Sequence, residues 1–307
     1  MKGVAEAPGK VIISGEHFVV HGAAALAAAI ERKVRVEATR SDRLAVVSNL
    51  LDPEALKPAK KVVESLYKAR KGEPRVSISI TSTLTEGAGL GSSAATLVAV
   101  AGATSALEGW GLDGMALARA SEAGERLVHG NPSGIDAATS AMGGVIVFRR
   151  GEEPRRLELP APVTLLVASS GMRRNTGRLV SKVTGMKETY PSLFASLCES
   201  ASLVSRLCAE ALAKGDTASL GSLMTYGHAV LARAGASNKR LDELVDLCLS
   251  AGCLGAKLTG AGGGGSVLAV PPADPEEARA VAQRLTKSGH AAFLTKIPTE
   301  GARSWAE

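Results

Sequence analysis

Residues 87–95 read GAGLGSSAA, and this glycine-rich stretch decides how the first half of the chain folds. Before it, residues 76–80 (VSISI) alternate apolar and polar side chains at strand spacing. After it, residues 95–109 form an Ala-rich run typical of a helix. A glycine-rich turn therefore opens a helix, where accessible backbone N–H groups and the helix dipole suit a phosphate. A tight turn before a buried helix is the alternative, and this stretch alone leaves both open.

Two serines close the glycine run, and their hydroxyl groups allow two interpretations. Ser92 or Ser93 can cap the helix, or one of them can turn toward a metal ion. No Gly-Lys-Ser/Thr follows the glycines, so the stretch is not a Walker phosphate loop.

The chain has the composition of an ordinary globular protein. Its 307 residues are 45% hydrophobic and 21% charged, which suffices for two domains of about 150 residues. No apolar run approaches the ~18 residues of a membrane span, and the N-terminus lacks the features of a signal peptide, so we expect a cytoplasmic location. The net charge of +6 fits an anionic small substrate. The basic residues do not alternate with aromatic ones as in a nucleic-acid-binding surface.

The expected strands and helices mix without strict βαβ alternation, which favours an α+β fold over a doubly wound sheet. Strands are expected at residues 4–7, 34–38, 44–48, 76–80, 143–150, 163–169, 266–270 and 292–297. Helices are expected within 53–71 and near 94–108, 115–128, 176–188, 192–213, 217–234, 239–250 and 275–287. The charged, proline-punctuated segment 151–162 marks the boundary between an N-terminal domain (1–157) and a C-terminal domain (158–307).

A second motif, residues 7–22 (APGKVIISGEHFVVHG), joins a predicted Pro-Gly-Lys turn to a Gly-Glu-His triplet. Lys10 places a cation beside exposed backbone, and Glu16 and His17 are polar residues within an apolar segment. Polar groups in that setting need partners. Local capping and ion pairing is as good an explanation as a binding site for these residues taken alone.

A third motif, residues 125–136 (ERLVHGNPSGID), ends in a fixed carboxylate. Glu125 and His129 share a helix face at i, i+4. The Asn-Pro-Ser-Gly turn then delivers Asp136 to a defined place, where its carboxylate can accept a proton or hold a cation. Alternatively, Asp136 caps the helix that follows.

A fourth motif, residues 259–265 (TGAGGGG), contains a GxGxxG match at Gly260, Gly262 and Gly265. A strand follows these glycines instead of a helix, so we reject a dinucleotide-binding interpretation. The glycines instead let a backbone loop close over a ligand or another loop. His21, His228 and His290 are isolated and are interpreted as surface or core residues. The chain also lacks the HRD-type loop of protein kinases.

In this order and spacing, PGKVIISGEH, GAGLGSSAA, GNPSGID and KLTGAGGGGS resemble the motifs of the GHMP small-molecule kinase superfamily, and within it the mevalonate kinase branch most closely. The resemblance extends from Ala7 to about Val270. Gly-Glu-His followed by Val-Val-His-Gly is similar to the version in that branch, whereas galactokinases continue toward Asp-Tyr. Residues 173–180 (RRNTGRLV) are similar to the segment that supplies a substrate-contacting threonine, here Thr176. Residues 168–171 (ASSG) depart from the Asp-Thr-Gly-like turn of many relatives.

The resemblance implies transfer of the γ-phosphate of ATP to the C5 hydroxyl of mevalonate, in a cleft between two α+β domains, the second ferredoxin-like. Asp136 and Lys10 would be the catalytic residues, and Ser93 and Glu125 would hold Mg²⁺. The implied ATP-binding residues are Gly87, Ala88, Gly89, Leu90, Gly91, Ser92 and Ser93. The implied acceptor-binding residues are Lys10, Glu16, His17, Thr176, Gly260, Ala261 and Gly262.

Two alternatives stay open beside this function. Another GHMP kinase would act on a phosphomevalonate or a sugar. A non-catalytic relative would bind ATP or a metabolite and regulate a partner, but such a protein is expected to lose its acid or metal ligands. Lys10, Ser93, Glu125 and Asp136 are all present. A homodimer is compatible with the family, and we expect neither nucleic acid nor a membrane as partner.

Overall fold

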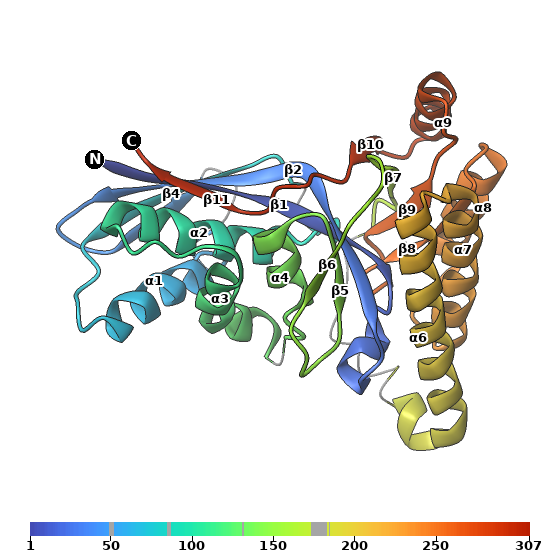
Figure 1. Cartoon of the computed structure of the whole chain (residues 1–307), viewed down its shortest axis with the longest axis horizontal. Helices are drawn as coiled ribbons and strands as arrows, with labels where there is room; N and C mark the ends of the chain where they lie inside the picture. The colour runs from blue at the N-terminus through green and yellow to red at the C-terminus, as the bar shows by residue number, and fades with distance from the viewer. Residues whose placement is uncertain (49–51, 85–86, 131, 173–182, 184) are drawn as a thin grey trace.

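The computed structural model describes residues 1–48, 52–84, 87–130, 132–172, 183 and 185–307. Among these residues the strands form two sheets, and each sheet is covered by its own set of helices (Figure 1). The first sheet has the order β11-β1-β2-β4-β3, with β5 paired to β2 and β6 to β5. The second sheet has the order β10-β7-β9-β8. This mixture confirms the α+β class.

The first sheet is covered on one face by the helices α1–α4 (Figure 1). Its strands are β1 (Lys2–Ser14), β2 (Ala25–Arg40), β3 (Ala45–Ser48), β4 (Val76–Ser82), β5 (Val145–Phe148), β6 (Arg155–Leu157) and β11 (Arg303–Ala306). Its helices are η1 (His17–His21), α1 (Lys57–Ala69), α2 (Ser92–Glu108), α3 (Gly114–His129) and α4 (Ile135–Met142). Helix α2 packs on β1 and β2 and also contacts α1, α3 and α4. Burial on all sides explains why this helix is rich in alanine and has no polar face.

The second sheet is entirely antiparallel and has the β-α-β-β-α-β order of a split βαβ unit. It comprises β7 (Thr164–Ser169), β8 (Gly255–Thr259), β9 (Ser266–Val270) and β10 (Ala292–Lys296). The helices are α6 (Pro191–Lys214), α7 (Thr217–Arg233), α8 (Lys239–Ser250) and α9 (Pro275–Lys287). The helix expected near 176–188 lies largely outside the described residues. In the parts of the chain that the structure describes, no helix is long and apolar enough to cross a bilayer.

Strand β1 differs from the prediction because it continues to Ser14, through the predicted Pro-Gly-Lys turn. The prediction of a turn is wrong. The register between β1 and β2 shifts between Pro8 and Lys10, so the residues form a β-bulge within the strand. Pro8 has no N–H to donate to the ladder. Gly9 leaves room for the glycine loop, since a Cβ there would lie 2.7 Å from the carbonyl oxygen of Leu90. The bulge therefore brings the first and second motifs into contact.

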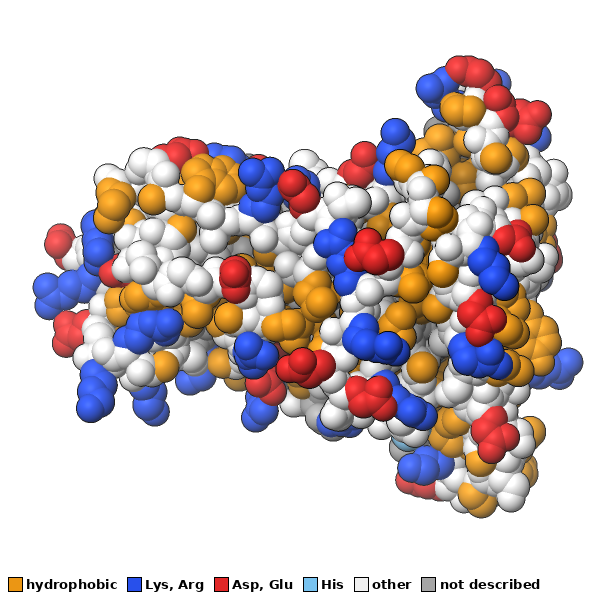
Figure 2. Space-filling view, in the orientation of Figure 1, with side chains coloured by type: hydrophobic (Ala, Val, Ile, Leu, Met, Phe, Trp, Pro, Cys, Tyr) orange, Lys and Arg blue, Asp and Glu red, His pale blue; other side chains and the backbone are white. Residues whose placement is uncertain are grey.

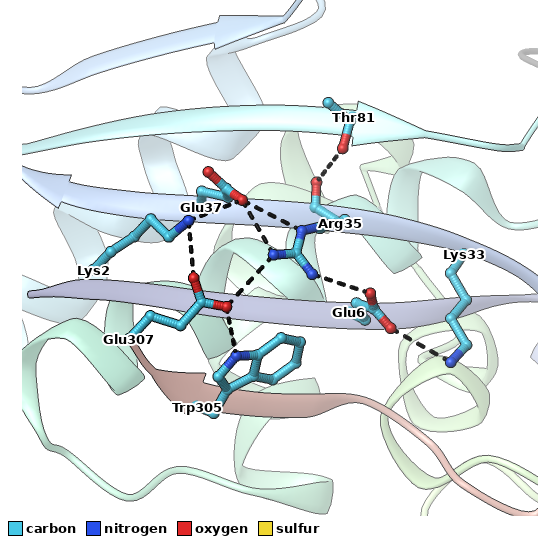
Figure 3. Close-up of polar contacts among 8 residues, drawn as sticks. All are labelled: Lys2, Glu6, Lys33, Arg35, Glu37, Thr81, Trp305 and Glu307. Carbon is cyan, nitrogen blue, oxygen red and sulfur yellow. Dashed lines mark hydrogen bonds and ion pairs between the residues drawn. The ribbon is translucent and has the colours of Figure 1, made fainter.

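The last strand, β11, returns to the first sheet and pairs with β1, so both chain ends lie together (Figure 1). At the end of β11 the Glu307 carboxylate pairs with Lys2 at 3.0 Å and accepts a hydrogen bond from the Trp305 indole (Figure 3). Exposed ion pairs of this kind stabilise little, so backbone pairing fixes the strand. The proposed boundary at 157/158 falls between β6 and β7. The sequence did not predict that the chain returns to the first sheet as β11.

Figure 2 shows acidic and basic side chains interspersed on the face it displays.

Candidate active site

A cavity of about 330 Å³ lies where the two halves of the chain meet. Its walls come from β1, η1, the end of α3, the start of α4 and the loop after β8. The predicted site residues that line it are Lys10, Glu16, His17, Glu125, Asp136, Gly260 and Ala261. The structure thus brings three of the four motifs to one cavity.

Lys10 and Asp136 form an ion pair in this cavity. The distance from Lys10 Nζ to Asp136 Oδ1 is 2.9 Å, and the two side chains are 4% and 32% exposed. Helix α4 starts after Gly134, which adopts a left-handed conformation (φ 89°) as the N-cap. The interpretation of Asp136 as the cap is therefore wrong. Its carboxylate lies in the first helical turn, where the helix dipole favours negative charge.

Glu125 is a buried carboxylate without a full set of partners. Its side chain lies on α3, the residue is 3% exposed, and Oε1 has no hydrogen-bond partner among the described residues. Burial, followed by the nearby charge of Asp136, raises the pKa of Glu125 to about 7, although Lys10 opposes the shift. An unpartnered buried carboxylate oxygen is costly, and a bound cation would remove that cost.

The glycine loop reaches α2 through left-handed backbone at Gly87, Gly89 and Gly91, with φ of 71°, 79° and 72°. Gly91 is the N-cap of α2, and no side chain caps this helix end in the described structure. The capping interpretation of Ser92 and Ser93 is therefore wrong. The first N–H groups of α2 are left uncapped by side chains, which suits an anion such as phosphate.

Lys10 and Ser266 hold this loop from opposite halves of the chain. The Lys10 N–H donates to the Leu90 carbonyl at 2.8 Å. A Cβ at Gly91 would lie 2.7 Å from Lys10 Cγ, so only glycine lets the lysine side chain pass. Ser266, which begins β9 after the second glycine run, donates its hydroxyl to the Ala88 carbonyl at 2.8 Å. The two glycine-rich loops are thus joined directly.

Models of two known domains match the chain: "GHMP kinases N terminal domain" over residues 57–144 and "GHMP kinases C terminal" over residues 208–291. The chain belongs to the GHMP kinase family. A mevalonate kinase of Aeropyrum pernix is 37% identical, with 97% of each chain covered. A mevalonate kinase of Thermococcus gammatolerans is 35% identical, with 99% of this chain and 98% of that one covered.

Solved structures agree with this membership. A mevalonate kinase of L. major in complex with R-mevalonate has a TM-score of 0.84 at 28% identity, and the match covers 95% of this chain and 94% of that one. A homoserine kinase of Cytophaga hutchinsonii has a TM-score of 0.80 at 20% identity, covering 99% of this chain and 97% of that one. The second likeness shows a shared fold alone, so the fold by itself does not select the acceptor.

In this GHMP kinase, the end of β1 is fastened to β8 and the loop after it. The Thr259 hydroxyl accepts from Ile12 N–H at 2.8 Å and donates to the Ile12 carbonyl at 3.1 Å. His17 Nε2 lies 2.7 Å from the Ala261 carbonyl. Glu16 lines the cavity, but its carboxylate pairs with Lys257.

The remaining predicted site residues have different outcomes. Gly262 is not among the described residues that line the cavity. It packs on Ala236 instead, where a Cβ would lie 2.1 Å from the carbonyl oxygen. Thr176 lies outside the described residues. The roles of all these residues toward ligands stay predictions.

Two further histidines of this GHMP kinase line the cavity, His21 and His129. From the sequence, His129 is placed on the helix face of Glu125 without a site role, and His21 is interpreted as a surface or core residue. His21 ends η1 and packs edge-on against Phe194, with ring centroids 4.9 Å apart. Burial, then the charges of Lys187 and His17, lower the pKa of His21. A spacing of four residues was no reliable signal here, because η1 is a 3₁₀ helix with three residues per turn, so His17 and His21 do not lie on one face of it.

Proposed function

We propose that this protein is a mevalonate kinase, which transfers the γ-phosphate of ATP to the C5 hydroxyl of mevalonate and yields 5-phosphomevalonate and ADP. The observation that supports it best is the Lys10–Asp136 pair in a cavity built by both halves of the chain. The near full-length similarity to mevalonate kinases favours this acceptor over a phosphomevalonate or a sugar.

Phosphoryl transfer needs in-line positioning and charge neutralisation more than covalent catalysis. Asp136 faces the acceptor hydroxyl and receives its proton, while the hydroxyl oxygen bonds to the γ-phosphorus and ADP leaves. Lys10 contacts both the proposed base and the glycine loop. Its ammonium group pairs with Asp136, and its backbone N–H donates to the loop that would bind the phosphates. One residue therefore links the proposed base to the phosphate-binding loop.

Glu125 and Ser93 are the residues that would hold Mg²⁺. The unpartnered Oε1 of Glu125 is an oxygen ligand of the kind Mg²⁺ prefers. The described residues contain no group of three or more His, Cys, Asp or Glu side chains suited to a metal. One carboxylate and one hydroxyl, from Glu125 and Ser93, fit Mg²⁺, which usually takes one or two carboxylates together with substrate phosphates. When bound, the ion neutralises phosphate charge.

The cavity also suits the acceptor. Mevalonate is a small hydroxy acid with one methyl branch and a negative charge. Lys10, His17 and His21 supply polar groups, and Ile12 and Val19 supply apolar surface. We propose a cytoplasmic enzyme of isoprenoid biosynthesis.

An ADP-release assay with mevalonate, 5-phosphomevalonate, homoserine and galactose tests this function. We expect mevalonate to give the highest kcat/KM. A higher value for another acceptor would contradict the assignment and identify a different GHMP kinase. ATP binding without turnover on any of the four would indicate a regulator.

Ser266→Ala is expected to loosen the nucleotide loop. The substitution leaves the Ala88 carbonyl without its buried donor, which costs about 1–3 kcal/mol of the free energy of unfolding. We expect the KM for ATP to rise more than the KM for mevalonate, because the lost bond holds the phosphate loop. Urea unfolding and steady-state kinetics measure both effects. Ser288→Ala is the matched control, since that exposed hydroxyl only donates to the Arg284 carbonyl of its own helix. Equal effects of the two variants would refute the role of the loop contact.

A further inference from the structure

Lys257 is a buried cation that does not line the cavity. It lies in β8 and is 0% exposed. Its ammonium group contacts the Glu16 carboxylate, the Leu258 carbonyl at 2.6 Å and the Ile12 carbonyl at 3.4 Å. An ammonium group has three hydrogens to donate, so all three have acceptors, and two of these belong to the other half of the chain.

The Lys257–Glu16 pair belongs to the seam that joins β8 and the loop after it to the end of β1 and the start of η1. In the same seam Thr259 bonds both backbone groups of Ile12, and His17 contacts the Ala261 carbonyl. Glu16 and His17 are consecutive, and both line the cavity. The Glu16 side chain is only 2% exposed beside Lys257, while the His17 ring is held separately by the Ala261 carbonyl.

The charges around the cavity show why the Lys257 contact matters. Asp136 is matched by Lys10, and Glu16 is matched by Lys257. Glu125, whose Oε1 has no partner among the described residues, is the proposed Mg²⁺ ligand. A carboxylate acceptor such as mevalonate would be repelled by a bare Glu16, because like charges interact strongly in a partly buried site. The role expected for Glu16, orienting the acceptor, stays a prediction.

We propose that Lys257 is a positioning residue of the acceptor site. It neutralises Glu16 and holds its carboxylate in the seam, so that Glu16 does not repel an anionic acceptor. This inference rests on the proposed function, since its electrostatic part needs a negatively charged acceptor.

The titratable groups that interact with Glu16 come from three elements: Lys257 from β8, His228 from α7 and Cys208 from α6. Burial lowers the pKa of His228 and raises the pKa of the Cys208 thiol. Both groups are therefore uncharged near neutral pH. Lys257 is the cation among them that pairs with the Glu16 carboxylate.

The Lys257→Met variant tests the inference because it keeps an unbranched side chain, one atom shorter, and removes its charge. We expect the KM for mevalonate to rise on the order of 10–100-fold, with the KM for ATP nearly unchanged.

The double variant E16Q/K257M, with E16Q alone, provides the control. If Lys257 acts through Glu16, the two variants should have the same KM for mevalonate. This comparison holds even if Lys257→Met alone fails to fold. An unchanged KM in Lys257→Met, or a double variant with a several-fold higher KM than E16Q, would overturn the inference. The wild-type acceptor assay is separate, so failure of the proposed function is recognised independently.

Discussion

Asp136→Asn is expected to lower kcat for phosphoryl transfer by about 10²–10⁴-fold, with ATP binding nearly intact. Asparagine keeps the shape of the side chain but has no negative charge and no basic oxygen. The acceptor hydroxyl then has no group to receive its proton. Lys10, whose ammonium group lies 2.9 Å from Asp136 Oδ1, also loses its counter-charge. The nucleotide loop contacts Lys10 through backbone atoms, so it should stay in place.

Single-turnover phosphorylation of mevalonate, measured beside titration with an ATP analogue, separates these two effects. Asp274→Asn is the matched control. Asp274 caps α9 through bonds to the N–H groups of Glu276 and Glu277, and asparagine caps a helix about as well as aspartate. This control should keep normal kcat. Near-normal phosphorylation by Asp136→Asn would show that Asp136 is not the catalytic base.

Local sequence patterns were enough to predict α2 and its glycine loop, because strand alternation, glycines and an Ala-rich run are read within about 30 residues. They failed for β1, where Pro8 and Gly9 looked like a turn. The contact that makes them a bulge, with Leu90, is far away in sequence. They failed also for β11, a four-residue strand whose existence depends on pairing with β1.

In the candidate site, too, some residues could be predicted from local sequence and others could not. Lys10, Glu125 and Asp136 lie in recognisable motifs, and all three line the cavity. Lys257 opens the KLTGAGGGGS motif, but no role is predicted for it from the sequence. Its partner Glu16 lies 241 positions away, and no local pattern reports such a pair. Burial and charge pairing between the halves of the chain are tertiary properties, so the residues that depend on them emerge only from the fold.

Glu125→Gln is expected to raise the Mg²⁺ concentration for half-maximal activity by at least tenfold, since a neutral amide replaces a charged ligand, which weakens binding by about 1.4 kcal/mol or more. In the metal-free protein, by contrast, the same substitution is expected to be favourable, because it removes a loss of folding stability as pH rises. Burial and the charge of Asp136 raise the pKa of Glu125 from 4.5 to about 7. Between these values the folded protein binds the proton and the unfolded chain does not, so stability falls as pH rises toward 7. The contribution is at most about 3 kcal/mol.

Urea unfolding of the metal-free protein at pH 5 and pH 8 measures this second effect. The wild type should lose more stability than Glu125→Gln over that interval, because glutamine has no proton to release. Glu122→Gln is the matched control on the same helix, where an exposed carboxylate pairs with Arg126, and it should keep both the wild-type Mg²⁺ titration and the wild-type pH slope. A Glu125→Gln variant with those wild-type properties would show that Glu125 is not a metal ligand. We expect Glu125→Gln to use Mg²⁺ less well and to be more stable at pH 8. Such a result would show that the ionised Glu125 carboxylate destabilises the metal-free fold and that its function is to bind the cation.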